Sequence, residues 1–154
     1  MIDLTTTYLG LQLKNPLVVS PSPLCQDVGR ISEMEDAGAA AVVLHSLFEE
    51  QIALNAGDLD RTLAAQKDGY AEAVSYLPEL HTYKLGPEEY LEHIRKAKAA
   101  VDIPVIASLN GATTGGWVRY AKLMEEAGAD ALELNIYYVA TDPTCPAGEV
   151  EQQY

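Results

Sequence analysis

The sequence predicts an α/β fold with a parallel sheet: a partial (β/α)8 TIM barrel of about four βα units, preceded by an N-terminal β-hairpin. Short apolar strands alternate with amphipathic helices, a pattern typical of a parallel sheet covered by helices. The passage "EMEDAGAAAVVL" (33–44) recurs as "LMEEAGADALEL" (123–134), each a helix that runs into a buried strand. No GxGxxG follows the first apolar strand, which disfavours a doubly wound dinucleotide-binding sheet.

The length of the chain predicts only part of a barrel. A complete barrel takes about 250 residues, whereas this sequence has 154 and supplies four strands of the eight. We therefore expect one domain, residues 1–154, that forms the N-terminal half of a barrel. Half a barrel leaves sheet edges unpaired, so we expect either a missing C-terminal half or self-association.

The first elements follow from alternation, helical spacing and turn residues. Residues 3–14 alternate polar and apolar around Gly10, which predicts a hairpin. The apolar run 17–19 predicts a short strand that ends at a Ser/Pro loop. Apolar residues at helical spacing predict a helix over 27–39, and Gly38 suits the position just past its end.

The middle of the chain combines a buried strand with a long irregular stretch. "AVVLHS" (41–46) predicts the second strand of the sheet. Residues 47–86 mix short helical pieces with turns, and a connection of this length is often a functional loop. A helix is predicted over 86–101, because Pro87 and two glutamates suit its first turn. "IPVIASLNG" (103–111) predicts the third strand.

The last predicted strand carries a polar pair. A helix over 116–129 leads into a strand over 130–138, and "AGEVEQQY" predicts the start of another helix. Glu133 and Asn135 are two positions apart in that strand, so both face the same side of the sheet.

Composition limits the classes of partner. The net charge is −13, and the sequence pI is near 4.4, which disfavours nucleic acid and anionic membrane surfaces. Two cysteines are too few for a disulfide framework, and no signal peptide or spanning segment is visible, so we expect a cytoplasmic protein. The three histidines, His45, His81 and His93, show no metal-ligand spacing, and we expect no metal.

Polar residues follow all four predicted strands. In parallel α/β architecture, ligands bind at the carboxyl ends of the strands. These ends are Ser20, Pro21 and Ser22; His45 and Ser46; Ser108, Asn110 and Gly111; and Asn135, Tyr137 and Tyr138. Such hydroxyls, carboxamides and backbone amides suit a neutral, planar ligand with many acceptors better than a metal, and a flavin fits this description.

The segments "KNPLVVSPS", "GAAAVVLHS", "PVIASLNG" and "GADALELNIYY", in this order and spacing, resemble the N-terminal half of dihydroorotate dehydrogenases. These are FMN-dependent (β/α)8 barrels, and the resemblance runs over nearly the whole chain. It implies a flavin-dependent oxidoreductase that oxidises dihydroorotate to orotate, a small-molecule substrate, in pyrimidine biosynthesis. The residues that it implies for FMN binding are Ser20, Pro21, Ser22, His45, Ser46, Ser108 and Asn135. Asn135 is also implied to contact the substrate, and Glu133 matches the acidic residue two positions before it.

The chain departs from this family on the substrate side. Tyr138 occupies the position of the family's catalytic base, and an unperturbed tyrosine, with a pKa of about 10, is a poor base at neutral pH. Cys145 is the nearest thiol, ten positions past Asn135 (145 − 135 = 10). The asparagine-rich orotate-binding segment of the family has no counterpart in "AEAVSYLPEL" (71–80). The alternative function is therefore a catalytically silent or incomplete barrel fragment that acts as a binding or assembly module. A non-flavin barrel enzyme ranks last, because no strand end offers a lysine or paired acids.

Overall fold

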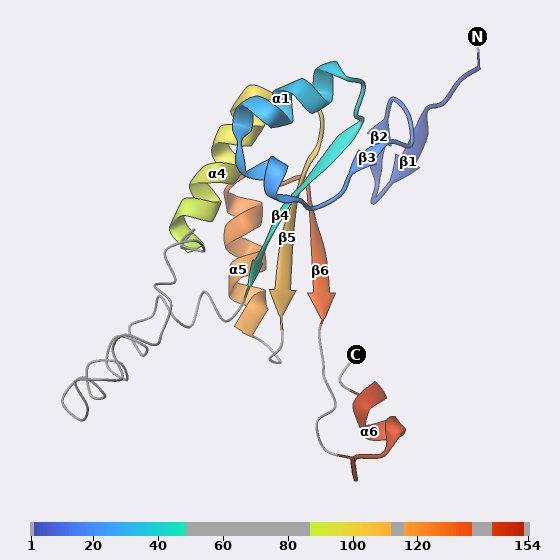
Figure 1. Ribbon diagram of the computed structural model, residues 1–154, viewed down its shortest axis with the longest axis vertical. Coiled ribbons are helices and arrows are strands. Elements are labelled where there is room, and N and C mark those ends of the chain that lie inside the picture. Colours follow the sequence, from blue (N-terminus) through green and yellow to red (C-terminus); the bar gives the residue numbers. More distant parts are fainter. Residues whose placement is uncertain (1, 49–86, 112–115, 137–142, 153–154) are drawn as a thin grey trace, which may run out of the picture.

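The computed structural model describes residues 2–48, 87–111, 116–136 and 143–152. Its centre is a parallel sheet of four strands in the order β3-β4-β5-β6, and the antiparallel hairpin β1-β2 lies at the end where these strands begin (Figure 1). Helices α1, α4 and α5 lie together beside the sheet (Figure 1). The predicted α/β class, with four parallel strands after a hairpin, is confirmed.

The bounds of the elements agree with the predicted order. The strands are β1 (Thr6–Tyr8), β2 (Leu11–Leu13), β3 (Val18–Val19), β4 (Ala41–Phe48), β5 (Val105–Gly111) and β6 (Ala131–Ile136). The helices are η1 (Pro23–Gln26, a 3-10 helix), α1 (Val28–Asp36), α4 (Pro87–Ala100), α5 (Gly116–Glu126) and α6 (Ala147–Glu151). Strand β5 is buried along its whole length because it lies between two neighbouring strands and its helix-side face packs in the main core.

The duplicated sequence passage builds the same helix end twice. After α1, Gly38 N–H donates to the Glu35 carbonyl at 2.9 Å and Ala39 N–H to the Met34 carbonyl at 3.0 Å. The same two bonds recur after α5: Gly128 N–H donates to the Glu125 carbonyl at 2.9 Å, and Ala129 N–H donates to the Met124 carbonyl at 3.1 Å. The two glycines have φ of +104° and +100°, a left-handed conformation that only glycine adopts without strain. The prediction that Gly38 ends the helix is confirmed.

The main core lies between the helices and one face of the sheet. Its strand residues include Val42, Leu44, Val105 and Leu109, all fully buried. The helices contribute the buried side chains Ile31, Tyr90, Ile94, Ala97, Met124 and Ala127. Each large apolar side chain buried in this way contributes about 1.5–3 kcal/mol. This layer fixes the helix-covered face of the sheet.

A smaller core lies on the opposite face, near the start of the strands. Ala41, Val43 and Ile106 are buried there together with Leu13 of the hairpin. The hairpin therefore covers the beginning of this second face, hereafter the inner face. Beyond Val43 and Ile106 the same face becomes polar, and the candidate site begins at that point.

Two predicted boundaries were wrong. The irregular segment predicted over 47–86 cannot start at residue 47, because Leu47 and Phe48 continue β4 and pair with Leu109 and Asn110 of β5. Residues 49–86 lie outside the described residues. The first strand is shorter than predicted, since β3 excludes Leu17, whose side chain is 64% exposed.

The Ser/Pro loop after β3 contains a helical turn that the sequence did not predict. Pro23–Gln26 forms η1, with Cys25 fully buried inside it. Pro23 occupies the first position of this turn, where its missing N–H is not required. The last strand was predicted over 130–138, whereas β6 ends at Ile136, and residues 137–142 lie outside the described residues.

Candidate functional site

One extra residue in β4 decides which side chains face the site. Val43 pairs with Ile106, but Ser46 pairs with Ser108, so β4 uses three steps (46 − 43) where β5 uses two (108 − 106). A bulge of this kind interrupts the alternation of side chains along a strand. Ser46 therefore faces the same side as Val43, and its neighbour His45 faces the helices instead.

Four polar side chains meet on the inner face, at the carboxyl ends of three adjacent strands. Ser46 Oγ lies 2.8 Å from Ser108 Oγ, and Ser108 Oγ donates to Glu133 Oε1 at 2.9 Å. Asn135 Nδ2 donates to Ser108 Oγ at 3.3 Å and to Glu133 Oε1 at 3.2 Å. We call Ser46, Ser108, Glu133 and Asn135 the rim cluster. Three of these residues, Ser46, Ser108 and Asn135, were predicted to bind the cofactor. The fourth, Glu133, is the acidic residue predicted two positions before Asn135.

Register explains why the rim cluster forms. Ser108 pairs with Ser46 on one side and with Glu133 on the other, so these three side chains lie in one row across the sheet. Asn135 lies two residues further along β6, on the same face as Glu133. Ser108 is fully buried, whereas Ser46, Glu133 and Asn135 are half-buried, so the cluster can be approached from the inner face.

Tyr90 of α4 fixes the backbone beneath the rim cluster. Its hydroxyl donates to the Ser108 carbonyl at 3.2 Å and accepts from the Ser108 N–H at 3.0 Å. These bonds lie beside the bulge, where the β4–β5 ladder is interrupted. Burial raises the pKa of the Tyr90 hydroxyl, so it remains protonated and can make both bonds. Sequence reasoning missed this role, because helical spacing can indicate that a side chain is buried but not which group it bonds.

Asn110 continues the polar row along β5. It lies two residues beyond Ser108 on the same face and pairs in register with Asn135. Only 6% of the residue is exposed, and its Oδ1 is buried with no hydrogen-bond partner among the described residues. The sequence placed Asn110 at a strand end but assigned it no contact, although strand periodicity alone puts it beside the rim cluster.

The rim cluster has the chemistry of a site for a neutral, hydrogen-bonding ring. Its groups are two hydroxyls, one carboxamide and one carboxylate that accepts two hydrogen bonds. Hydroxyls can turn to donate or to accept, and a carboxamide offers both kinds of group. A flavin ring presents donors and acceptors along one edge, so Ser46, Ser108 and Asn135 suit its binding.

His45 lies on the opposite face from the rim cluster. Its ring packs edge-on against Tyr90, with centroids 5.0 Å apart, and lies 5.4 Å from the His93 ring. His93 Nε2 lies 2.7 Å from the Cys25 carbonyl, whereas both His45 nitrogens are buried without a partner among the described residues. Burial, and then the neighbouring His93, lower the pKa of His45 to about 4. The structure thus separates His45 from Ser46, which the sequence had grouped at one strand end.

The buried neutral ring of His45 predicts a loss of stability in acid. The unfolded chain binds a proton at this residue below about pH 6.5, while the folded ring takes one up only near pH 4. The contribution of the neutral His45 ring to the free energy of unfolding is therefore complete above about pH 6.5, and it falls as the pH drops toward about 4. Urea unfolding of the wild type and of His45→Phe across this range should show the steeper loss in the wild type. Parallel pH profiles for the two proteins would contradict the prediction.

The remaining predicted site residues do not join the rim cluster. Ser20, Pro21 and Ser22 lie between β3 and η1, where the Ser22 hydroxyl lies 3.7 Å from the Cys25 thiol. No hydrogen bond links these three to the cluster within the described part of the chain. Cys145 lies just before α6, half-exposed, with its Sγ 3.8 Å from Glu149 Oε2. Tyr138, the predicted position of the base, lies outside the described residues.

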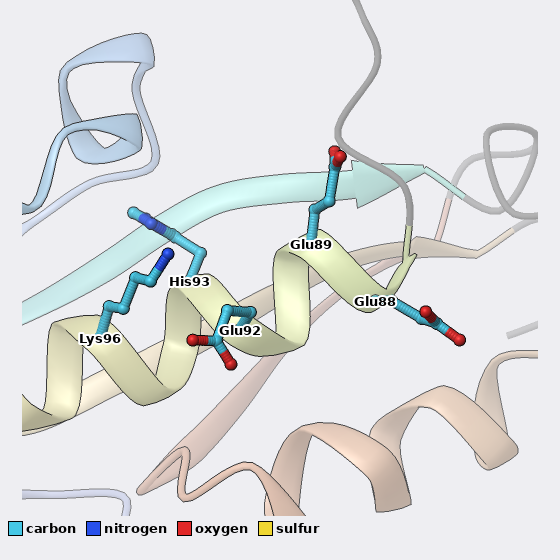
Figure 2. A pocket seen from close by; sticks show the side chains of 5 residues that line it. All are labelled: Glu88, Glu89, Glu92, His93 and Lys96. Atoms are coloured by element: carbon cyan, nitrogen blue, oxygen red, sulfur yellow. The ribbon is translucent and has the colours of Figure 1, made fainter.

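A surface hollow of about 480 Å³ lies along α4, away from the rim cluster. It is lined by Glu88, Glu89, Glu92, His93 and Lys96 (Figure 2). Figure 2 shows Glu88 and Glu89 pointing in different directions, so their carboxylates do not converge on one point. Every lining residue comes from a single helix, and we place the candidate site at the rim cluster instead.

Two further classes of feature are absent from the described ranges. Within residues 2–48, 87–111, 116–136 and 143–152, no group of three or more His, Cys, Asp or Glu side chains is placed to bind a metal. None of the helices described there combines the length and the apolar character needed to cross a membrane.

Comparison with known proteins supports the resemblance predicted from the four motifs. The catalytic subunit of dihydroorotate dehydrogenase B (NAD(+)) from Thermoplasma acidophilum is 29% identical over 142 residues, and that of Thermoplasma volcanium is 30% identical over the same length. Each match covers 88% of this chain and 42% of the relative. The NAD-dependent dihydropyrimidine dehydrogenase subunit PreA of Escherichia coli is 28% identical, over 86% of this chain and 32% of its own. No family model matches the chain.

These matches confirm the predicted similarity to dihydroorotate dehydrogenases over most of the sequence. The chain spans about two fifths of the length of the dihydroorotate dehydrogenases that it matches, in agreement with the predicted half. Among solved structures, the IMP dehydrogenase/GMP reductase-like protein of Corynebacterium glutamicum has a TM-score of 0.50 and 22% identity. That match covers 99% of this chain and 41% of the other, and it bears on the fold alone.

Proposed function

Because this chain is similar to dihydroorotate dehydrogenases over 88% of its residues, we propose that it forms the flavin-binding part of an FMN-dependent oxidoreductase. The substrate would be dihydroorotate or a related cyclic dihydropyrimidine, oxidised at a carbon–carbon bond. The observation that carries the proposal is the rim cluster, which joins three strands at their carboxyl ends by four hydrogen bonds. Ligands of parallel α/β enzymes bind at this end of the sheet.

In this proposal, FMN would supply the hydride acceptor, and the chain would bind and orient it. Ser46 and Ser108 would turn their hydroxyls toward the polar edge of the ring. Glu133 would orient Ser108 and Asn135, because it accepts a hydrogen bond from each. Asn135 would direct its carbonyl oxygen toward the ring or the substrate, since its amide nitrogen is bonded within the cluster. We also propose that the loop just after β3 contacts FMN, through the backbone and hydroxyl groups of Ser20, Pro21 and Ser22.

The proton leaving the substrate needs an acceptor, and two residues are proposed. Tyr138 follows the end of β6 by two positions (138 − 136), which puts it close to Asn135 along the chain. The Cys145 thiol is half-exposed and available to approach a ligand. Tyr138→Phe and Cys145→Ser, assayed separately, assign the base: the required residue is the one whose loss stops reduction of bound FMN by dihydroorotate.

Purification of the complete gene product that contains these residues tests the proposal. We expect a yellow protein, or a colourless one that gains flavin absorbance when reconstituted with FMN. Anaerobic addition of dihydroorotate should then bleach the flavin. A protein that never binds FMN would refute the proposal. A flavin that dihydroorotate and dihydrouracil both leave oxidised would favour a silent binding module instead.

The sheet also needs a cover on its β6 side. Among the described strands β6 pairs only with β5, and Ala131 to Asn135 are all half-buried. We propose that further strands, from a longer polypeptide or from a second copy, cover this edge, because open edges associate. Light scattering on the chain of 154 residues should show a dimer or larger species, and a stable monomer would contradict self-association.

A further inference from the structure

Asn110 has a polar atom that the fold leaves unpaired. It is 94% buried (100 − 6), and its Oδ1 has no hydrogen-bond partner among the described residues. Nearly all buried polar side-chain atoms in proteins are paired, since an unpaired one costs the folded protein free energy. An atom of this kind at a strand end, beside four interacting polar groups, indicates a partner that arrives with a ligand.

A second asparagine, Asn15, is a structural residue whose carboxamide is hydrogen-bonded at both its nitrogen and its oxygen. Asn15 Nδ2 donates to the Gly38 carbonyl at 2.9 Å, and its Oδ1 accepts from the Leu17 N–H at 2.9 Å. Both ends of that side chain are used within the fold. Asn110, although more deeply buried, lacks such a partner for its carbonyl. Structural bonding therefore explains Asn15 but not Asn110.

The position of Asn110 connects it to the candidate site. It pairs with Asn135 across the β5–β6 ladder and lies two residues from Ser108 on the same face. Asn135 itself belongs to the rim cluster, since its Nδ2 donates to Ser108 Oγ and to Glu133 Oε1. The two asparagine side chains thus lie side by side on the inner face at the end of the sheet.

We propose that Asn110 is a ligand-binding residue whose Oδ1 accepts a hydrogen bond from a ring N–H of a cyclic imide or ureide. A carbonyl oxygen accepts and cannot donate, so its partner must bring an N–H or O–H. A planar ring that carries N–H between two carbonyls presents such a donor with flanking acceptors for the serine hydroxyls. This inference rests on the proposed function and adds the contact that would select the ring.

Two ligands of the proposed enzyme carry this group. The flavin ring has one imide N–H, at N3, and dihydropyrimidines have ring N–H groups at N1 and N3. The shared chemistry is the ring N–H, and methylation removes it at a chosen position. Two relatives are named as dehydrogenases of dihydroorotate and of dihydropyrimidines. Both of these compounds contain the ureide ring, which supports this class of ligand.

The test compares Asn110→Leu with Asn15→Leu in the complete gene product. Leucine has the same branching as asparagine and no polar atoms, so Asn110→Leu removes the unpaired carbonyl, and wherever its larger methyl groups fit it should raise the melting temperature of the flavin-free protein. Asn15→Leu breaks two structural hydrogen bonds and should lower it. The smaller Asn110→Val controls for overpacking: a fall in melting temperature for both Asn110→Leu and Asn110→Val would show that the carbonyl is paired within the fold, and it would overturn the inference.

Binding measurements then identify the ligand. If Asn110 contacts the flavin, wild type should bind FMN about 5- to 100-fold more tightly than 3-methyl-FMN, the range expected for one buried group left unpaired. Asn110→Leu should weaken FMN binding and abolish that preference. If Asn110 contacts the substrate, the same pattern should appear between dihydroorotate and its N1- or N3-methyl derivative, with FMN binding unchanged.

Different results would refute the role of Asn110 and the proposed function. Asn15→Leu should retain the wild-type preference for the unmethylated ligand. Equal effects of methylation in wild type and Asn110→Leu, on both FMN and dihydroorotate, would overturn the role of Asn110 while leaving the proposed function intact. A wild-type protein that binds neither FMN nor dihydroorotate would refute the proposed function and this inference with it.

Discussion

Replacing Tyr90 by Phe is expected to lower the free energy of unfolding by about 2–4 kcal/mol, because it leaves two buried backbone groups of Ser108 without their partner. The hydroxyl accepts from the Ser108 N–H at 3.0 Å and donates to the Ser108 carbonyl at 3.2 Å. Tyr90 itself is fully buried, so water cannot easily replace the lost bonds. Urea unfolding at neutral pH measures the change.

Tyr120→Phe provides the matched control for this substitution. Tyr120 lies on α5, packs against the same core, and makes no hydrogen bond among the described residues. Its loss of a hydroxyl should change the free energy of unfolding by less than about 0.5 kcal/mol, as for substitutions away from such features. Equal effects at the two positions would show that Tyr90 acts by packing alone.

Tyr90→Phe should also weaken the binding of FMN. Ser108 is the centre of the rim cluster, because its hydroxyl bonds Ser46, Glu133 and Asn135. A shift of its backbone therefore moves the group that connects all three strands. Fluorescence quenching of FMN on binding should show lower affinity for Tyr90→Phe, while Tyr120→Phe keeps the wild-type value.

Replacing Glu133 by Leu is expected to weaken FMN binding by roughly 10- to 100-fold, the effect of losing hydrogen bonds to a charged group. Glu133 Oε1 accepts from both Ser108 Oγ and Asn135 Nδ2, so one substitution frees two side chains that would contact the ring. Stability should change little, because a half-buried carboxylate is replaced by an apolar group of similar size.

Glu133→Gln should give an intermediate effect. It keeps one oxygen that can accept both bonds but loses the charge, and charge-assisted hydrogen bonds are about twice as strong as neutral ones. Glu125→Gln on the exposed side of α5 is the control for the loss of charge alone. If Glu133→Leu binds FMN as tightly as the wild type, the carboxylate does not orient the site, and the proposed role of the rim cluster fails.

Much of the fold could be predicted from local patterns. Alternating apolar strands and amphipathic helices predicted the parallel sheet, and Gly38 was correctly predicted to end the helix before β4. These features depend on burial and on the backbone conformation of single residues, which neighbouring residues in the chain determine. The extension of β4 to Phe48 was missed, because the pairing with β5 that sustains it is not local.

The candidate site was likewise predictable only where its residues lie close together in the sequence. Glu133 and Asn135 share a face by strand alternation within a single strand, so the sequence was sufficient to group them. Tyr90 could not be connected to Ser108 from the sequence, since eighteen positions and a change of element separate them. The contact depends on how α4 packs on the sheet.

The sequence by itself determined the order of the elements, the polar character of the strand ends and the similarity to dihydroorotate dehydrogenases. The tertiary structure alone decided which side chains of β4 reach the site. Strict alternation from Val43 would place His45 on the inner face and Ser46 against the helices. The extra residue between Val43 and Ser46 reverses this order, so Ser46 bonds Ser108 while His45 packs on Tyr90. A bulge is defined by the register of two strands paired across the sheet, and β5 lies more than fifty residues further along the chain.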